Sequence, residues 1–197
     1  MRRFFNFFLL AALLAVCLSS CKGGTKALLP SVSGKAGEVL VVIDRADWEG
    51  NVGNATRELL ADECPYLAQR EPLYTLVNVT PAGFDSDMFK IHRNVLLFKI
   101  DPQIDSAGVF FRKDVWSQPQ CVIQVAAYDV DGAVELLQKK GSLIVRTIEQ
   151  AERDRVIRNT LLYEEKGIYE AVAKEFGGAP HFPMGYKIKK ASPDFYW

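Results

Sequence analysis

The chain contains 197 residues, of which 49% are apolar, and its 24 lysines and arginines balance 24 aspartates and glutamates. This composition is typical of a globular protein, and it excludes a disordered chain and a strongly basic nucleic-acid-binding protein. A domain of about 150 residues buries roughly 70% of the surface of its unfolded chain, so the core needs neither a metal nor a disulfide for stability.

A hydrophobic segment begins the chain. Residues 4–18 are almost entirely apolar and follow Arg2 and Arg3. The run is too short to cross a bilayer comfortably, and its order of charged and then apolar residues is typical of a secretory signal. We therefore expect residues 1–20 to be a signal peptide that is removed on export.

The end of this apolar run resembles a bacterial lipobox. Cys21 follows the small residues Ser19 and Ser20, and the cysteine at this position of a lipobox is acylated, for example with palmitate. Cys17 fits less well because it follows Val16, a branched residue where the pattern requires a small one. Two or more acyl chains hold a protein durably on a membrane, since each buried methylene contributes about 0.8 kcal/mol. The alternative is a plain secreted protein that carries an unmodified Cys21.

The residues after the anchor indicate where the protein resides. Lys22 stands where an aspartate retains some bacterial lipoproteins in the inner membrane, so we expect an outer-membrane lipoprotein that faces either the periplasm or the cell surface. Residues 21–36 are small and polar, with Pro30 and Gly34, and we expect them to form a flexible tether between the membrane and the domain. Without residues 1–20 the net charge is about −2, which indicates no particular partner.

The domain is expected to occupy residues 37–197 and to begin with a strand and a helix. Residues 38–44, with the sequence EVLVVID, are a continuous run of mainly β-branched and apolar residues, which is typical of a strand covered on both faces. Residues 48–64 contain turn glycines followed by a helical pattern, with Leu59 and Leu60 on the apolar side.

More extended segments follow, interrupted by a short helix over residues 82–91. The segment 73–81 alternates apolar and polar residues, which predicts a half-buried strand, and the segment 94–101 is a second continuous apolar run. Two further runs, 109–115 and 120–127, are separated by the sequence WSQP. Because its proline cannot lie inside a central strand, we expect the two runs to form a hairpin.

The last third of the chain is predicted to be helical as far as Gly177. After Asp129, which we expect to cap the helix, apolar residues recur with a period near 3.6. Gly141 interrupts this stripe and costs roughly 1 kcal/mol in a helix interior, so we expect a break or kink there. A further helix is expected over residues 166–176 and a final strand over residues 185–192.

Together these segments predict an α+β fold, a single mixed sheet of about five or six strands with helices packed on it, preceded by a lipoprotein signal peptide. Once Cys21 is acylated, Cys64 and Cys121 are the remaining cysteines of the mature chain. They could form a disulfide in an oxidising envelope or remain free thiols, and their spacing in the sequence leaves both alternatives open.

The segment after the first strand contains the weak candidates for ligand binding. Ligands favour the carboxyl ends of strands in α/β sheets, and Asp44 and Trp48 follow the first strand. Gly50 and Gly53 could direct backbone N–H groups at an anion. The segment lacks the lysine and serine or threonine of a phosphate-binding loop and the three-glycine spacing of a dinucleotide site. The alternative is a tight connection in which Asp44 caps a turn and Trp48 packs.

No residue pattern predicts catalysis or metal binding. His92 and His181 stand alone, without a second ligand at metal-binding spacing, and no serine lies in a G-x-S-x-G turn. Residues 129–132 begin like a calcium loop but lack its later acidic ligands. We therefore expect no catalytic residue, no metal and no cofactor, and we interpret both histidines as structural.

The order of several short motifs resembles a known family. The motifs run from residue 37 to the end of the chain: GEVLVVID, DWEG, VTPAGFD, RNVLLFKID, KDVWSQPQ, AERDR and DFYW. Their succession is similar to that in uncharacterised Bacteroidetes lipoproteins catalogued as domain of unknown function 4837. The resemblance implies a cell-envelope lipoprotein without assigned catalytic residues. Members of that family continue beyond the position of Trp197 into a second α/β half, so the resemblance also implies a chain truncated at its C-terminus.

Two functional hypotheses follow. The first is a non-enzymatic, membrane-anchored lipoprotein that binds an envelope protein or glycan through an aromatic or apolar surface around Trp48, Trp116 or Trp197. The alternative is an envelope hydrolase or small-ligand-binding enzyme, which requires Asp44, Asp101 or His92 to converge in a cleft at the carboxyl ends of the strands. A nucleic-acid partner is not expected, because the chain has no basic excess.

Overall fold

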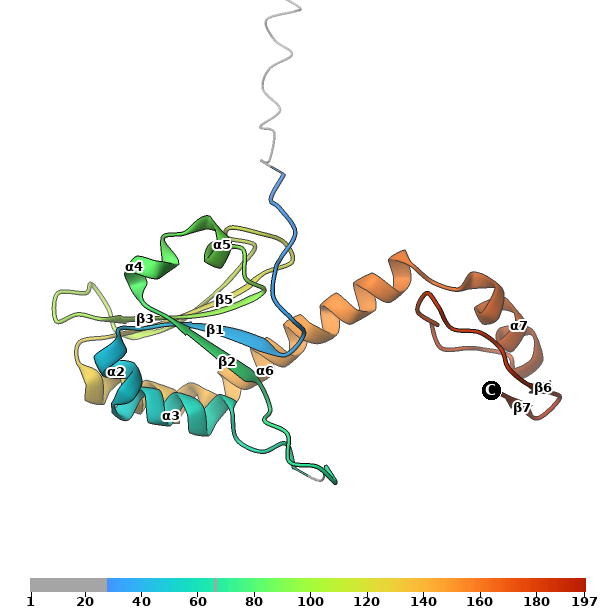
Figure 1. Cartoon of the computed structure of the whole chain (residues 1–197), viewed down its shortest axis with the longest axis horizontal. Helices are drawn as coiled ribbons and strands as arrows, with labels where there is room; N and C mark the ends of the chain where they lie inside the picture. Colours follow the sequence, from blue (N-terminus) through green and yellow to red (C-terminus); the bar gives the residue numbers. More distant parts are fainter. Residues whose placement is uncertain (1–27, 66) are drawn as a thin grey trace, which may run out of the picture.

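A mixed five-stranded sheet forms the main body of the protein, with the strand order β2-β1-β3-β5-β4 (Figure 1). The computed structural model describes residues 28–65 and 67–197. β1, β2, β3 and β5 run parallel, and β4 runs antiparallel to β5. The strands are β1 (Glu38–Val42), β2 (Thr75–Val79), β3 (Asn94–Ile100), β4 (Gly108–Lys113) and β5 (Cys121–Ala127). The predicted α+β class, the mixed sheet and the β4–β5 hairpin are confirmed.

Helices cover both faces of the sheet (Figure 1). α3 and α6 pack on one face, and the short helices α4 and α5 lie over the other. The helices are α2 (Arg45–Glu49), α3 (Asn51–Leu60), α4 (Pro81–Phe84), α5 (Asp87–Lys90), α6 (Val130–Leu162) and α7 (Lys166–Phe176). The single helix expected over residues 82–91 is thus a pair of short helices.

The continuous apolar sequence of β1 reflects its position inside the sheet. Val39 and Val41 pack toward α3 and α6, whereas Leu40 and Val42 pack toward α4 and the start of β3. All four side chains are buried, and each buried side chain of this size contributes about 1.5–3 kcal/mol. Because both faces of β1 are covered, its sequence shows no alternation between apolar and polar residues.

The long helix α6 is continuous through Gly141, so the predicted break at that residue was wrong. Gly141 is buried where α3 packs against α6, and a Cβ atom there would lie 2.7 Å from Leu59 Cδ1. The glycine therefore permits close approach of the two helices, and their packing offsets its low helix propensity. At the N-terminus of α6 the predicted cap is confirmed, because Asp129 Oδ1 accepts a hydrogen bond from the Gly132 N–H at 2.8 Å.

Residues 163–197, which we call the C-terminal unit, lie at the far end of α6, apart from the sheet (Figure 1). The unit contains α7 and a separate two-stranded sheet formed by β6 (Ala191–Ser192) and β7 (Phe195–Tyr196). Of the strand expected over residues 185–192, only the last two residues form a strand, which is β6.

Both cysteines of the described chain, Cys64 and Cys121, are free, so the disulfide alternative is not realised. The proposed signal peptide and Cys21 lie outside the described residues. Of the helices within the described residues, none combines the length and the apolar character needed to cross a bilayer.

Candidate functional site

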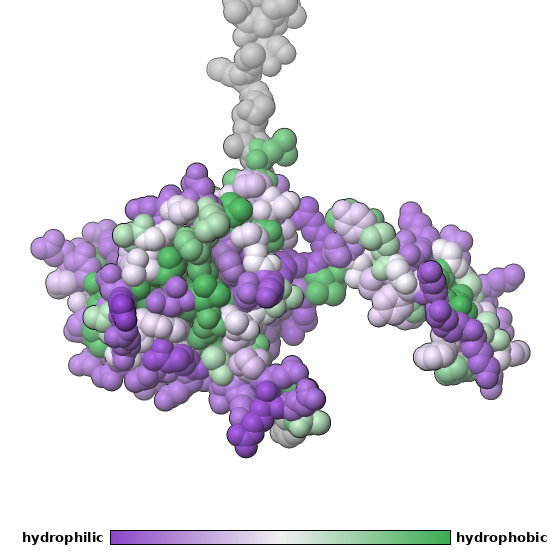
Figure 2. Space-filling model, in the orientation of Figure 1, coloured by the Kyte–Doolittle hydropathy of each residue, from purple (hydrophilic) through white to green (hydrophobic). Residues whose placement is uncertain are grey.

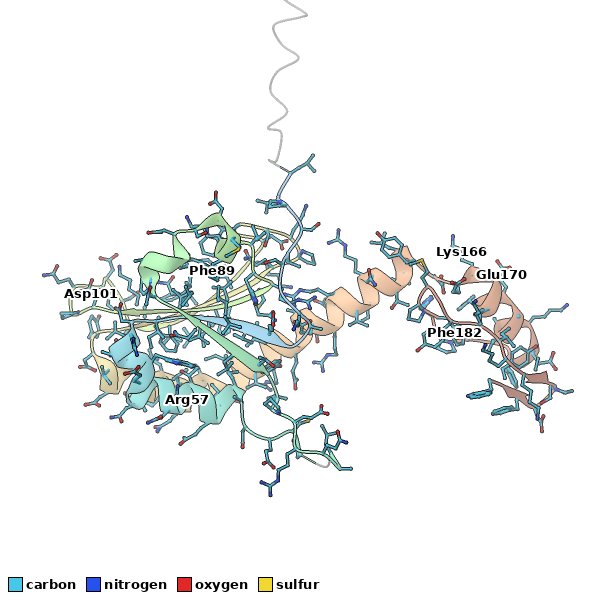
Figure 3. The ribbon with its side chains drawn as sticks, viewed as in Figure 1. Arg57, Phe89, Asp101, Lys166, Glu170 and Phe182 are labelled. Carbon is cyan, nitrogen blue, oxygen red and sulfur yellow. The ribbon has the colours of Figure 1, made fainter. Side chains whose placement is uncertain are left out.

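The candidate residues of the enzyme hypothesis lie at opposite ends of the parallel strands. Asp44 follows β1 and Asp101 follows β3. Since these strands are parallel, both aspartates lie at the carboxyl ends of the strands (Figure 3 labels Asp101). His92 lies two residues before the first residue of β3, at the amino ends of the strands. Asp101 Oδ1 accepts a hydrogen bond from the Gln103 N–H at 2.8 Å, which closes a local turn. The fold does not bring His92 together with the two aspartates.

The glycine segment after β1 forms a close contact between α2 and α3. A Cβ atom on Gly53 would lie 1.8 Å from the backbone oxygen of Trp48, so only glycine fits there. The Gly50 N–H donates to the Asp47 carbonyl at 3.2 Å. The Arg57 guanidinium lies over the Trp48 ring, 4.5 Å from its centroid, and Nη1 donates to the Trp48 carbonyl at 3.1 Å. Trp48 and Gly53 therefore have packing roles, and the Gly50 N–H is already hydrogen-bonded within the protein.

A dense set of polar side chains lies at the amino ends of β1, β3 and β5, and we call it the amino-end cluster. The side chains come from three strand ends and from α6, which passes over them. Its members are Glu38, His92, Arg93, Asn94, Gln120, Glu152 and Arg155. His92, Asn94, Gln120 and Arg155 are buried, with at most 7% of each residue exposed.

Arg155 is the centre of the amino-end cluster. Its Nε donates to the Pro119 carbonyl at 2.9 Å, and Nη2 donates to the Arg93 carbonyl at 2.7 Å and to Asn94 Oδ1 at 3.0 Å. Nη1 lies 3.0 Å from Glu152 Oε1 in an ion pair whose angle does not make a hydrogen bond. Burial lowers the pKa of Arg155, but an arginine stays charged in proteins. One side chain of α6 thereby connects the turns that precede β3 and β5.

His92 connects the same cluster to the segment before β1. The His92 ring lies with Nδ1 3.1 Å from the Asn94 carbonyl and Nε2 3.6 Å from Glu38 Oε2. Gly34 has a φ of +88° and packs against the imidazole, where a Cβ atom would lie 2.5 Å from Nε2. The backbone N–H of Lys35 lowers the pKa of the Glu38 carboxyl, and His92 contributes less. Each polar group near His92 is thus engaged in holding residues 34–38 against the sheet.

A groove of about 560 Å³ lies between the edge strand β4 and α6. Phe111 and Leu143 form apolar parts of its wall, and Arg112, Lys113 and Arg146 add positive charge. Cys121 lies in its lining, and burial raises the pKa of this thiol to about 11. At neutral pH the thiol is therefore protonated and is a poor nucleophile.

A second groove, of about 520 Å³, lies in the C-terminal unit between α7 and the β6–β7 hairpin, and we call it the aromatic groove. Its lining residues are Ile168, Val172, Phe176, Phe182, Tyr186, Lys187, Ile188, Lys189, Asp194, Phe195, Tyr196 and Trp197. Phe176 and Tyr196 meet edge to face with ring centroids 5.5 Å apart. Trp197 is 75% exposed and Phe195 is 50% exposed. Figure 2 shows hydrophobic residues exposed among hydrophilic ones on this unit, and Figure 3 labels Phe182 within it.

Within residues 28–65 and 67–197, no group of three or more histidine, cysteine, aspartate or glutamate side chains could hold a metal ion. The second histidine, His181, lies in the C-terminal unit, where Nδ1 is 2.6 Å from Glu164 Oε1 and the ring stacks on Tyr169. The His181 side chain thus contacts a carboxylate and an aromatic ring of the same unit.

The family model that matches the chain is that of a domain of unknown function, DUF8532, over residues 32–161. The chain belongs to this family. The match begins in the segment that packs on His92 and ends in the last turn of α6, so it includes the whole sheet and the amino-end cluster and stops before the C-terminal unit. Neither the curated proteins nor the solved structures contain a match to the chain.

The DUF8532 match corrects the family resemblance drawn from the sequence. The resemblance to domain of unknown function 4837 was wrong, because the matching model is that of a different family. Its motifs were strand sequences and turns, which many parallel α/β units share because the same packing requires them. The second α/β half expected beyond Trp197 depended on that resemblance and has no other support.

Sequence reasoning missed the amino-end cluster. On the solvent side of α6, Glu149 and Arg153 form an ion pair four residues apart. Glu152 and Arg155, a pair three residues apart on the same helix, are largely buried. The available signal was their position on the apolar stripe of α6, where an arginine requires buried partners.

Proposed function

We propose that the protein is a lipid-anchored component of the bacterial cell envelope that binds another protein and catalyses no reaction. The anchor is an acylated Cys21, and the location is the outer membrane. The support for both is the order of charged, apolar and small residues in positions 1–22.

The observation that carries the binding function is the aromatic groove. Monomeric proteins seldom leave large aromatic side chains in a group at the surface unless a partner covers them. Here Tyr186, Phe195 and Trp197 are each at least 50% exposed around one groove. Aromatic residues of this kind supply most of the binding energy in protein interfaces, because they bury a large area with few rotatable bonds.

The lining favours an apolar protein segment over a glycan as the partner. Apolar and aromatic side chains line most of the groove, and its charged residues are Lys187, Lys189 and Asp194. Sugar recognition needs many directed hydrogen-bond groups, whereas such a lining suits leucine-like or aromatic side chains of an amphipathic segment. The enzyme alternative has less support because His92 lies across the sheet from Asp44 and Asp101.

The anchor can be tested by labelling cells with a fatty acid. We expect label on the wild-type protein and none on Cys21→Ser, because no other residue can take its place at the cleavage site. Cys17→Ser is the matched control and should remain labelled. Label on the Cys21→Ser variant would contradict the proposed anchor.

The aromatic groove can be tested by photo-crosslinking in cells. A photoreactive residue in place of Phe195 should give one adduct of defined mass, and Ile188→Glu should abolish it by placing a charge in the groove. The same probe in place of Phe110 on β4, which is 38% exposed, serves as the surface control. Adducts that persist with Ile188→Glu, or that form equally at Phe110, would contradict a binding function for the groove.

A further inference from the structure

The two edges of the main sheet differ in charge. At one edge β4 ends in Arg112 and Lys113, and charged side chains on an edge strand discourage pairing with another chain. At the other edge β2 has no charged residue, and neither has the stretch around it from Leu73 to Pro81. Only the β2 edge is therefore open to strand pairing without an electrostatic penalty.

The backbone of β2 leaves hydrogen-bonding groups free on its outer side. The Thr75 N–H donates to the Gly37 carbonyl at 2.9 Å, and the Val79 carbonyl accepts from the Ile43 N–H at 3.1 Å. Since inward and outward groups alternate along a strand, Leu76 and Asn78 direct their N–H and C=O groups away from β1. The described residues provide no partner for these groups, because β1 is the only strand beside β2.

The free part of the edge is short and well defined. Just before β2, the Tyr74 N–H donates to the Leu60 carbonyl at 2.9 Å and the Leu73 N–H donates to the Asp62 carbonyl at 2.8 Å. Just after β2, Thr80 caps α4 through a hydrogen bond from the Gly83 N–H to its Oγ1. The open edge is thus confined to β2 itself, and Asn78 Nδ2 fixes the strand by donating to the Val41 carbonyl at 3.2 Å.

The side chains of β2 suit pairing with an identical strand. Thr75, Val77 and Val79 lie on one face, where the two valines pack against the core beneath α4. All three are β-branched, and β-branched side chains pack well across neighbouring strands. Figure 2 shows hydrophobic atoms at the surface over the front of the sheet, where β2 runs in Figure 1.

We propose that β2 docks a second copy of this chain, antiparallel to itself, about a two-fold axis at Val77. Leu76 then exchanges both backbone hydrogen bonds with the partner subunit's Asn78, and the symmetric pair does the same. Val77 packs on the partner subunit's Val77, and Thr75 packs on the partner subunit's Val79. The two sheets become one continuous sheet, and an interface of this isologous kind closes at two subunits.

A second copy suits this edge because β2 carries no charge, so the two-fold axis opposes β-branched residues and brings no like charges together. Each cross-strand pair contributes roughly 0.2–1 kcal/mol, so the interface is weaker than a standard interface of about 1,600 Å². The pairing is therefore weak in dilute solution, and confinement to a membrane would raise the fraction of paired chains. The proposal is independent of the aromatic groove, which lies in the C-terminal unit.

Disulfide trapping tests the two-fold axis directly. In the full-length chain carrying Cys64→Ser, Val77→Cys should oxidise to a disulfide-linked dimer, since opposed residues of a non-hydrogen-bonded pair have Cα atoms about 4.5 Å apart. The matched control is Phe110→Cys on the other edge strand, in the same background and with the same oxidant. Equal dimer yields from Val77→Cys and Phe110→Cys would overturn the proposal.

Sedimentation of the full-length chain in detergent tests the same edge without new cysteines. The wild type should be at least tenfold more dimeric than Leu76→Pro, which removes an outward N–H, and than Val77→Lys, which places two like charges at the axis. Phe110→Lys should not change the dimer fraction. A wild type that is monomeric at about 100 µM would overturn the proposal even if a β2 variant failed to fold.

Discussion

The sheet domain and the C-terminal unit use similar side chains in opposite ways. In the sheet domain the large apolar residues of β1, β3 and β5 are covered on both faces. The buried polar side chains of the amino-end cluster, His92, Asn94, Gln120 and Arg155, form hydrogen bonds within the protein. In the C-terminal unit Val172 is the buried residue of α7, and most of the aromatic side chains are exposed. A unit of this size is too small to enclose a core of its own. The contrast indicates that the first region provides stability and the second provides surface for recognition.

The largest expected effect is the loss of the buried arginine of the sheet domain. Arg155→Ala should lower the free energy of unfolding by about 3–5 kcal/mol, because it removes the ion pair with Glu152 and the hydrogen bonds to Asn94 Oδ1 and to two carbonyls. Urea denaturation followed by tryptophan fluorescence would measure it.

Two controls define the meaning of that loss. Arg153→Ala, on the exposed side of the same helix, should cost less than about 0.5 kcal/mol, as should His181→Ala in the C-terminal unit. If Arg155→Ala cost no more than these variants, the amino-end cluster would not hold α6 on the sheet, and the contrast between the two regions would fail.

Glycines offer a second comparison of the two regions. Gly53→Ala should destabilise the sheet domain by about 2–3 kcal/mol, because its new Cβ would overlap the Trp48 backbone oxygen, which cannot rotate away. Gly167→Ala in α7 has open space around it and should be neutral or stabilise that helix by up to about 1 kcal/mol. Thermal unfolding monitored by circular dichroism would measure both. A stabilising Gly53→Ala would show that α2 and α3 can separate without loss.

The features that were predicted from the sequence depend on neighbouring residues, and the features that were missed depend on distant ones. The apolar run of β1 and the cap at Asp129 are local patterns, and both were predicted correctly. The continuity of α6 at Gly141 depends on α3, which lies more than 80 positions earlier. The hydrogen bond from Arg155 to the Arg93 carbonyl joins residues separated by 62 positions, so no local period could reveal it.

The candidate ligand residues show the same limit. Asp44, Trp48, Gly50 and Gly53 lie near one another because they are close along the chain. Their orientation depends on packing between α2 and α3, which turns Trp48 toward the core and under Arg57. The alternation of β2 was visible in the sequence, but its position at an edge depends on the order of strands in the sheet.

An effect on stability that is confined to alkaline pH also originates in the sheet domain. Burial raises the pKa of the Cys121 thiol from 9.0 to about 11. Below pH 9 the thiol is protonated in both states, so its full contribution to stability is present. As the pH rises from 9 to 11 the unfolded chain loses this proton first, and the folded state loses about 2–3 kcal/mol relative to it.

Comparison of the wild type with Cys121→Ala isolates this contribution. The free energy of unfolding of the wild type should fall more steeply above pH 9 than that of Cys121→Ala, by about 2–3 kcal/mol at pH 11. Tyr74, whose pKa burial raises to about 12, is present in both proteins, and because Cys121 is the smallest of the causes of its shift, most of its contribution cancels in the difference. Parallel stability profiles of the two proteins would mean that water reaches Cys121 through the groove beside β4. The core of the sheet domain would then be as open to solvent beside β4 as the C-terminal unit is at its aromatic groove.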